Sequence, residues 1–216
     1  MKPLPIKKRL SITEIFVSLQ SEGPYAGTPA VFIRLARCNL TEHCGFCDTD
    51  HAPRRTMRPT DIINEVIELT EFREVGLVVI TGGEPFLQDL APLVLRLVSE
   101  DYVVQIETNG TLYQPGFPYH HEMVSVVCSP KEGKPVHPQL AGKIAAYKYL
   151  IAENTEVNER GLPKACSQPI AGEVFLQPID TKDPERNRGN QLRAVELCLF
   201  FGHRFSFQIH KILGIP

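Results

Sequence analysis

Several features that would define a class of protein are missing from this sequence of 216 residues. Its 23 basic and 25 acidic side chains are mixed along the chain. It therefore lacks the broad basic field that nonspecific nucleic-acid binding requires. No apolar run approaches the length that crosses a bilayer, and the basic N-terminal residues are not followed by the apolar segment of a signal peptide. We expect a cytoplasmic protein that acts on a small molecule, without direct contact with nucleic acid or membrane.

The sequence also lacks internal repeats, low-complexity tracts and stretches depleted of apolar residues. Apolar residues make up 43% of the chain and charged residues 22%, so a chain of this length can bury a substantial core without disulfides. The polar stretch 153–168 is the segment that most resembles an insertion, and we expect it to be a loop. These features predict a single domain over residues 1–216.

Short β-branched runs alternate with stretches of helical period, a pattern typical of βαβ units and a parallel sheet. The expected strands are 31–36, 77–80, 102–106, 123–127, 147–151, 174–176 and 204–209, and the expected helices are 60–70, 89–100 and 190–201. Asp89 is the expected cap of the second helix. Polar clusters follow four strands, at 81–84, 107–110, 129–131 and 177–180. Because ligands of parallel sheets lie beyond the carboxyl ends of the strands, these clusters should face one site.

Three of the six cysteines, Cys38, Cys44 and Cys47, lie close together directly after an apolar strand. In a reducing cytosol such a set indicates metal ligands or redox chemistry rather than disulfides. Thiolates select iron–sulfur clusters, zinc or copper(I). This segment alone leaves two readings equally open, a cluster or a structural zinc site with His43 or His51 as fourth ligand. A redox pair of Cys44 and Cys47 is a weaker alternative, because no helix start follows it.

The turn Thr81-Gly82-Gly83-Glu84-Pro85 follows a buried strand. Its two glycines permit backbone angles and close approaches that other residues are denied. Backbone carbonyls and a carboxylate gathered there would suit an ammonium group. Alone, such a turn would indicate only a change of chain direction. Because it follows shortly after a three-cysteine segment, the two motifs together are a more specific indication of function.

Together, the cysteine segment, the glycine turn and the βα pattern resemble the radical S-adenosylmethionine superfamily. Further motifs narrow this resemblance to the 7-carboxy-7-deazaguanine synthase family. They extend over the whole chain, at residues 14–16, 19–23, 32–35, 46–50, 81–85, 106–110, 128–131, 176–180 and 210–216. The chain departs from this pattern at two points. Its cysteine spacing is C-x5-C-x2-C, whereas C-x3-C-x2-C is the commonest spacing in the superfamily. It also has Ser21 where the family usually has glycine.

The resemblance implies an α/β fold, a partial (β/α) TIM-like barrel of about six units with a radical S-adenosylmethionine core. In the family, a [4Fe–4S] cluster with one open iron chelates S-adenosylmethionine, and its reduction, by a reductase such as flavodoxin, yields a 5′-deoxyadenosyl radical. The radical takes hydrogen from 6-carboxy-5,6,7,8-tetrahydropterin, which contracts and loses ammonia to give 7-carboxy-7-deazaguanine for queuosine or other deazapurines. Mg²⁺ on the substrate carboxylate assists, and the enzyme is a homodimer.

The resemblance also implies roles for individual residues. The implied metal ligands are Cys38, Cys44 and Cys47 for the cluster and Thr49 for Mg²⁺. The implied contacts of S-adenosylmethionine are Phe46, Cys47, Asp48, Gly83, Ser129, Pro130, Lys131, Gln177, Pro178, Ile179 and Asp180. The implied substrate contacts are Leu19, Gln20, Ser21, Arg34, Thr81 and Pro216, with Glu107 as a further polar contact.

Several of these residues have plainer interpretations. From the sequence alone, Lys131 and Asp180 could be solvated loop charges. Arg34 lies among apolar neighbours and needs a carboxylate partner, which an internal Asp or Glu could supply as well as the substrate. The tail should be docked, with Ile212, Leu213 and Ile215 as apolar anchors that hold Pro216 in the site.

Two alternative functions remain. Another small radical S-adenosylmethionine enzyme, such as a glycyl-radical activase, would share the cluster and the glycine turn but should lack the motifs at 19–23 and 210–213. A non-catalytic zinc-binding scaffold would be recognised by metal analysis and by the lack of a brown colour.

Overall fold

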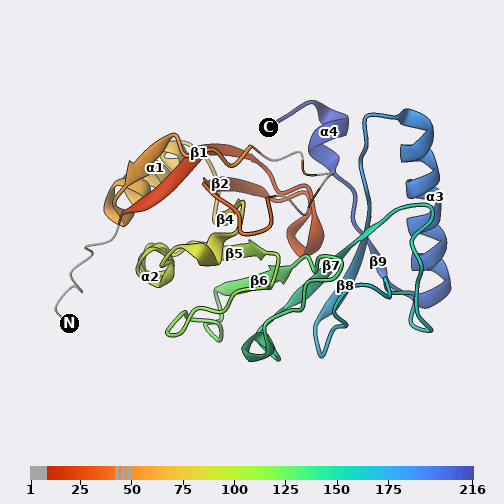
Figure 1. Cartoon of the computed structure of the whole chain (residues 1–216). Helices are drawn as coiled ribbons and strands as arrows, with labels where there is room; N and C mark the ends of the chain where they lie inside the picture. Colours follow the sequence, from red (N-terminus) through yellow and green to blue (C-terminus); the bar gives the residue numbers. More distant parts are fainter. Residues whose placement is uncertain (1–8, 42–43, 45–46, 48–49) are drawn as a thin grey trace.

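The computed structural model describes residues 9–41, 44, 47 and 50–216. Their centre is a nine-stranded sheet in the order β3-β1-β2-β4-β5-β6-β7-β8-β9. Strands β2 and β4 to β9 run parallel, whereas β1 pairs antiparallel with both β2 and β3. The bounds are β1 Leu10–Leu19, β2 Pro29–Leu35, β3 Arg55–Met57, β4 Leu77–Gly82, β5 Val103–Thr108, β6 Val124–Cys128, β7 Ala146–Ile151, β8 Glu173–Pro178 and β9 Arg204–Phe205. The sheet curves without closing (Figure 1), as a partial barrel should.

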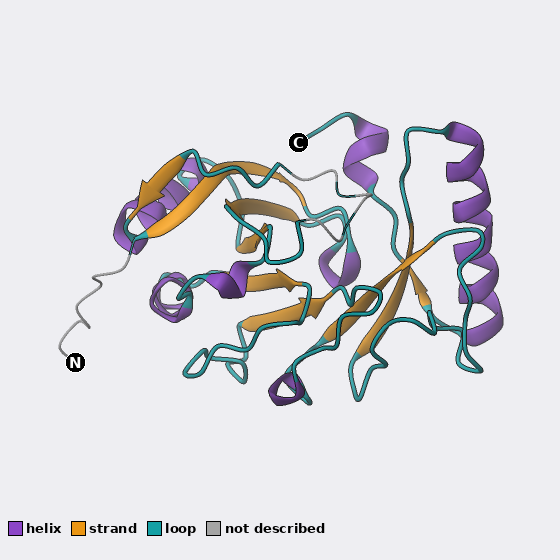
Figure 2. Ribbon diagram, in the orientation of Figure 1, coloured by secondary structure: helices purple, strands orange, loops and turns teal. Residues whose placement is uncertain are grey.

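The helices cover the outer face of this sheet unevenly. They are α1 Pro59–Thr70, α2 Ala91–Ser99, α3 Pro184–Phe201 and α4 Ile209–Leu213, with short 3-10 turns at Gly23–Tyr25, Pro85–Leu87 and Pro138–Leu140. Helices α1 and α2 pack together beside β1, β2 and β5, and α3 packs on β7, β8 and β9 (Figure 2). The connections β5–β6 and β7–β8 contain no α-helix. The barrel therefore has its expected parallel strands but a reduced helical layer, and 153–168 is a loop with one isolated bridge.

The helix ends follow from their caps. In α1, which begins at Pro59, the Asp61 carboxylate accepts a hydrogen bond from the backbone N of Arg58 at 3.2 Å. Helix α3 begins at Pro184 rather than at residue 190, because the side chain of Asp183 accepts hydrogen bonds from the first turn. The predicted cap of α2 is wrong: its N-cap is Leu90, whose backbone N donates to Oε1 of Gln114 at 2.9 Å. Leu90 is fully buried, so its burial in the core delays the helix start.

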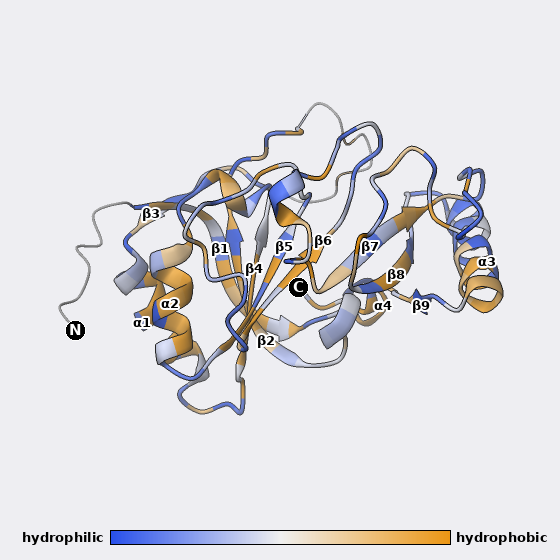
Figure 3. Cartoon of the chain, turned by 90° about the horizontal axis from the view of Figure 1, so that it is seen from below, coloured by the Kyte–Doolittle hydropathy of each residue, from blue (hydrophilic) through white to orange (hydrophobic). Residues whose placement is uncertain are grey.

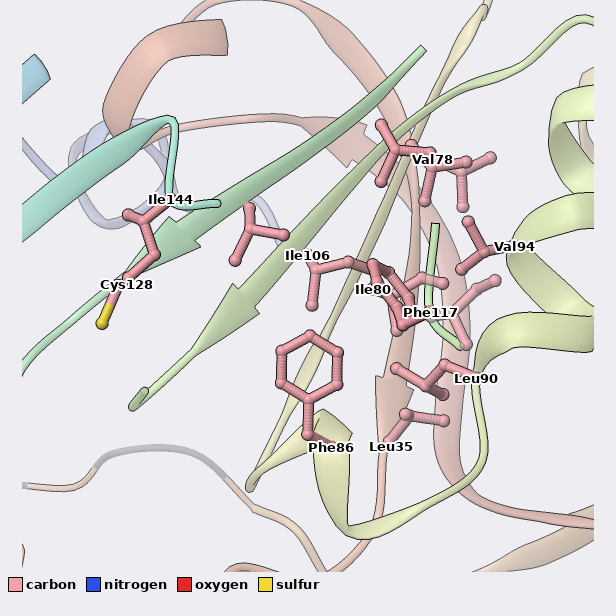
Figure 4. Close-up of a cluster of buried hydrophobic side chains, with 14 of the residues drawn as sticks. Leu35, Val78, Ile80, Phe86, Leu90, Val94, Ile106, Phe117, Cys128 and Ile144 are labelled. Carbon is pink, nitrogen blue, oxygen red and sulfur yellow. The ribbon is translucent and has the colours of Figure 1, made fainter. Parts of the chain in front are cut away.

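The two faces of the parallel sheet differ in polarity. Val104 and Ile106 of β5 join the apolar core that Figure 4 shows between the strands and α2. The alternating residues Gln105 and Glu107 belong to the opposite face. Parallel strands covered on both faces are apolar throughout. The polar inner face therefore marks a cavity.

Helix α3 carries exposed apolar side chains. Leu192, Val195, Leu199 and Phe200 of α3 are exposed, and Figure 3 shows hydrophobic segments among the hydrophilic ones of this helix.

The predicted strand 204–209 ends at Phe205, and residues from Ile209 onward form α4 instead. No helix in the described part of the chain is both long and apolar enough for a membrane span.

Candidate functional site

A cavity of about 660 Å³ lies at the carboxyl ends of the parallel strands. The structure brings most of the predicted site residues to its wall. These are Leu19, Gln20, Ser21, Arg34, Cys38, Cys44, Cys47, Thr81, Gly83, Ser129, Lys131, Gln177, Pro178, Ile179, Asp180 and Pro216, together with Glu107. Pro130 is buried and does not line the cavity. Its carbonyl oxygen accepts a hydrogen bond from Sγ of Cys166 at 3.7 Å. Phe46, Asp48 and Thr49 lie outside the described residues, as does His43.

The three predicted cysteine ligands line one part of the cavity. Burial raises the pKa of Cys38 and of Cys44, and at Cys44 the Lys131 ammonium opposes this. Among the described Cys, His, Asp and Glu residues, no three are gathered as a preformed metal site. Three thiols at one cavity could hold a cluster with one open iron, and His51 lines the same cavity as the candidate fourth ligand of a zinc site. Loading a metal would release protons from these thiols.

The glycine turn lies directly against the chain that leads into the cysteine segment. A Cβ on Gly82 would be 2.0 Å from the carbonyl oxygen of Leu35, and one on Gly83 would be 1.9 Å from that of Arg37. The backbone N of Glu84 donates to the Arg37 oxygen at 2.9 Å. The two glycines are therefore required because the turn and the start of the cysteine segment share one narrow space.

Glu84 connects two strand ends beside the cavity. Its fully buried carboxylate accepts hydrogen bonds from Phe86 N at 3.0 Å, Thr108 Oγ1 at 2.8 Å and Asn109 N at 2.8 Å. Burial raises its pKa, and these donors oppose the shift. The carboxylate thus joins the end of β4 to the end of β5, and Gly82 and Gly83 line the cavity instead. Its expected contact with an ammonium group stays a prediction.

The β5 end also reaches the cysteine segment, through contacts that were not predicted. The side-chain amide of Asn109 donates to Oδ1 of Asn39 at 3.0 Å, and the Asn39 amide donates to Thr111 Oγ1 at 2.8 Å. Asn39 directly follows Cys38, so this pair fixes the first cysteine relative to β5. An asparagine between clustered cysteines gives no signal by itself.

Lys131 and Asp180 are both tied to the protein. Lys131 Nζ donates to Ser129 Oγ at 2.6 Å, and burial lowers its pKa, with Lys148 acting in the same direction. Asp180 accepts from Lys211 Nζ and from Asn187 Nδ2, each at 2.6 Å. Neither is a freely solvated loop charge.

Polar contacts on the opposite side of the cavity converge on Glu107. Its Oε1 accepts from Gln20 Nε2 at 3.1 Å and from Gln105 Nε2 at 3.0 Å, while its Oε2 accepts from Thr81 Oγ1 at 3.2 Å. Ser21 Oγ shares a hydrogen bond of 2.5 Å with His210 Nδ1. Three predicted substrate contacts are therefore linked to the ends of β5 and to α4.

Arg34 has an internal partner. Its Nε donates to Glu14 Oε1 at 2.6 Å, and its guanidinium lies 5.5 Å from the ring centroid of Phe16. Glu14 and Arg34 are directly opposite each other on β1 and β2. In this structure an internal carboxylate is therefore the partner of Arg34, as one of the two interpretations of the sequence expected. Both side chains line the cavity.

The ion pair of Glu22 and Lys148 was missed. Lys148 is 6% exposed, and its Nζ lies 3.9 Å from Glu107 in addition to its contact with Glu22. Burial tends to raise the pKa of Glu22, but Lys148 and Gln208 hold it at about 2. The sequence does contain a signal for this pair, because Lys148 lies inside the apolar run Ala146–Ile151. Like Arg34, a lysine buried there needs a carboxylate partner.

The chain end is docked, but by polar contacts. Ser18 Oγ donates to the Pro216 oxygen at 2.6 Å, and Lys211 pairs with Asp180. Ile212 and Leu213 are 66% and 56% exposed, so they are not the predicted anchors. Helix α4 turns these two side chains outward, whereas a strand would have buried one side.

The comparisons with known proteins agree with this fold. Residues 32–126 match the Radical SAM superfamily, and a partial parallel barrel with a three-cysteine segment at its cavity defines a radical S-adenosylmethionine enzyme. The 7-carboxy-7-deazaguanine synthase of Rickettsia prowazekii is 39% identical over 96% of this chain and 89% of that protein. Its counterpart from Rhodospirillum rubrum is 39% identical over 95% of this chain and 92% of that protein. The chain belongs to the 7-carboxy-7-deazaguanine synthase family.

A solved structure supports the same assignment. The crystal structure of QueE from Escherichia coli aligns with a TM-score of 0.70 at 26% identity, covering 93% of this chain and 94% of that chain. Membership of the radical S-adenosylmethionine superfamily implies S-adenosylmethionine and a [4Fe–4S] cluster as cofactors.

Proposed function

We propose that this enzyme converts 6-carboxy-5,6,7,8-tetrahydropterin to 7-carboxy-7-deazaguanine with loss of ammonia. The carrying observation is that one cavity of about 660 Å³ joins the three cysteines to the polar set around Glu107. A cofactor bound at the first side would face a substrate bound at the second. The near full-length relatives named for this product support the same reaction.

The cofactor side is formed by the cysteine segment and the ends of β4, β6 and β8. Cys38, Cys44 and Cys47 would hold the cluster. Gly83, Ser129, Lys131 and residues 177–180 would contact S-adenosylmethionine, with Phe46 and Asp48 added on the resemblance alone. Pro130 would support this wall from behind. When bound, the cluster and S-adenosylmethionine supply the radical chemistry, and the protein supplies position and a shielded cavity.

The substrate side offers paired donors and acceptors. Gln20 and Thr81 already donate to Glu107, and this array could exchange partners with the amide and amino groups of a pterin. Arg34 would bind the substrate carboxylate, which would compete with Glu14 for the guanidinium. Pro216 would contact the far edge of the pterin through its main-chain carboxylate.

A direct assay tests this function. The reconstituted protein is incubated anaerobically with the tetrahydropterin, S-adenosylmethionine, Mg²⁺ and a reductant, and the product is identified by mass. Cys38→Ala is the matched control that should form none. If the wild-type protein carries a full cluster but gives no deazaguanine, the proposal is wrong.

Mg²⁺ would assist by binding the substrate carboxylate, with Thr49 as its protein ligand, because this ion prefers hard oxygen donors. Removing Mg²⁺ should slow turnover much more than it weakens S-adenosylmethionine binding, and Thr49→Val should have the same effect. Equal wild-type turnover with and without Mg²⁺ would count against this role.

The remaining partners are a reductase such as flavodoxin and a second copy of the chain. The exposed residues Leu192, Val195 and Leu199 form a stripe along α3, and a twofold contact would place this stripe against itself. Leu199→Glu should shift a dimer to monomer in sedimentation velocity, whereas Phe72→Glu, at a residue 87% exposed after α1, should not. We also propose a cytoplasmic location, because clustered cysteines that act as metal ligands are typical of a reducing compartment.

A further inference from the structure

The ion pair between Glu22 and Lys148 lies in the cavity wall and takes no part in the reaction proposed above. We propose that Lys148 is a positioning residue. Through Glu22 it holds two separate parts of the substrate side together, namely the loop 20–25 and the tail segment 206–210. The effect on substrate rests on the proposed function, but the coupling of the two segments does not.

Lys148 belongs to the polar inner face of the sheet. Its neighbours in β7, Tyr147 and Tyr149, are buried in the apolar core on the other face. A buried ammonium is costly unless a carboxylate pairs with it. Glu22 is that partner, and it comes from a segment 126 residues away in the sequence. The pair therefore joins β7 to the connection that follows β1.

Glu22 also connects this loop to the tail. Its second oxygen, Oε1, accepts from Gln208 Nε2 at 2.8 Å. The residues on either side repeat the pattern, because Ser21 bonds His210 at 2.5 Å and the backbone N of Gly23 donates to Ser206 Oγ at 3.1 Å. Three consecutive residues of the loop thus each hold the tail, and only the middle one is also fixed to the sheet by an ion pair.

The loop and the tail both carry residues of the substrate side. Gln20, next to this set, donates to Glu107, and His210 begins the segment that ends at Pro216. Without the Lys148 ammonium, Glu22 would be a mostly buried carboxylate without its cation. The loop would relieve this cost by moving toward solvent, and the tail would move with it. Gly83 and Ser129 make none of these contacts, whereas Asp180 is held by Lys211 of the tail, so the part of the cofactor side at the ends of β4 and β6 should change less.

Four variants test the proposal in the cluster-loaded protein: Lys148→Met, Lys148→Arg, Glu22→Gln with Lys148→Met, and the control Lys164→Met. Lys164 pairs with Glu156 on the surface, where both side chains are mostly exposed. The readouts are hydrogen exchange of peptides covering 18–28 and 206–214, thermal unfolding, S-adenosylmethionine affinity, and KM and kcat for the tetrahydropterin.

We expect Lys148→Met to increase exchange in both segments together. It should also raise KM about tenfold or more, with a smaller change in kcat and in S-adenosylmethionine affinity. The double variant removes the unpaired charge, so it should regain thermal stability while its KM stays high, because no ionic contact holds the loop. Lys148→Arg should restore part of the substrate affinity, and Lys164→Met should behave as wild type.

Two results would overturn the proposal. One is that the double variant regains wild-type KM together with stability, which would make the pair purely structural. The other is that Lys148→Met leaves exchange unchanged in either segment. If the wild type forms no product, the proposed function fails, but the exchange measurements still decide whether Lys148 couples the two segments.

Discussion

The two sides of the cavity are constructed differently. The tightest contacts on the cofactor side are between backbones, with Gly82 and Gly83 pressed against Leu35 and Arg37. The substrate side is held by side-chain contacts between distant segments, such as Glu22 with Lys148 and Ser18 with Pro216. The first kind of contact allows almost no substitution, and the second is adjustable. The cofactor side is therefore suited to a fixed cluster and the substrate side to a ligand that enters and leaves.

The largest effect should come from the cysteines of the cofactor side. Cys38→Ala, Cys44→Ala and Cys47→Ala should each abolish cluster assembly and turnover, because a three-ligand cluster has no spare ligand. Cys166→Ala and Cys198→Ala should retain both. Iron and sulfide content with product assays measures this, and full activity in any of the first three would refute the ligand assignment.

Gly83→Ala tests the backbone contact itself. Its Cβ would lie 1.9 Å from the Arg37 oxygen, so the turn and the start of the cysteine segment must separate. We expect the free energy of unfolding to fall by about 3 kcal/mol. The variant should also retain its cluster poorly. Gly76→Ala is the matched control, because a Cβ there meets nothing within 4 Å. If both variants unfold at the same denaturant concentration, the close approach is unimportant.

On the substrate side, a Gly-Ser extension after Pro216 should weaken substrate binding severely while folding, cluster content and S-adenosylmethionine binding stay intact. The extension would place extra residues beside the Pro216 oxygen, which accepts from Ser18, at the cavity wall. The same extension before Met1 should be harmless. Wild-type KM for the tetrahydropterin in the extended form would show that Pro216 makes no substrate contact.

The smallest effect concerns acid stability of the metal-free protein. The pKa of Glu22 is lowered from 4.5 to about 2, so its contribution is present above pH 4.5 and is lost as the pH falls toward 2. That contribution is at most about 3 kcal/mol. Glu22→Gln with Lys148→Met should lack this part of the acid dependence. Denaturant unfolding of both proteins at pH 5 and pH 3 measures the difference, and parallel losses would contradict it.

The same contrast explains what sequence alone could predict. The parallel strands and α1 follow from apolar patterns, and the cofactor side follows from motifs whose members are neighbours in the chain. Strands β1 and β3 were not predicted, so the pairing of Glu14 with Arg34 could not be foreseen. Glu22 and Lys148 are far apart in sequence, and no local pattern states which distant carboxylate neutralises a buried lysine. The tail was misjudged because Ile212 and Leu213 were expected to be buried anchors, but they are exposed on the short helix α4.

An open nine-stranded sheet has two edges, and each edge strand could in principle recruit another chain. Here the edge strands are short, with three residues in β3 and two in β9. Each also carries an arginine in a surface ion pair, Arg55 with Glu65 and Arg204 with Glu173. Short, charged edges are poor templates for strand addition. The sheet can therefore remain open for its ligands without becoming a seed for aggregation, and lengthening β9 with apolar residues would remove that protection.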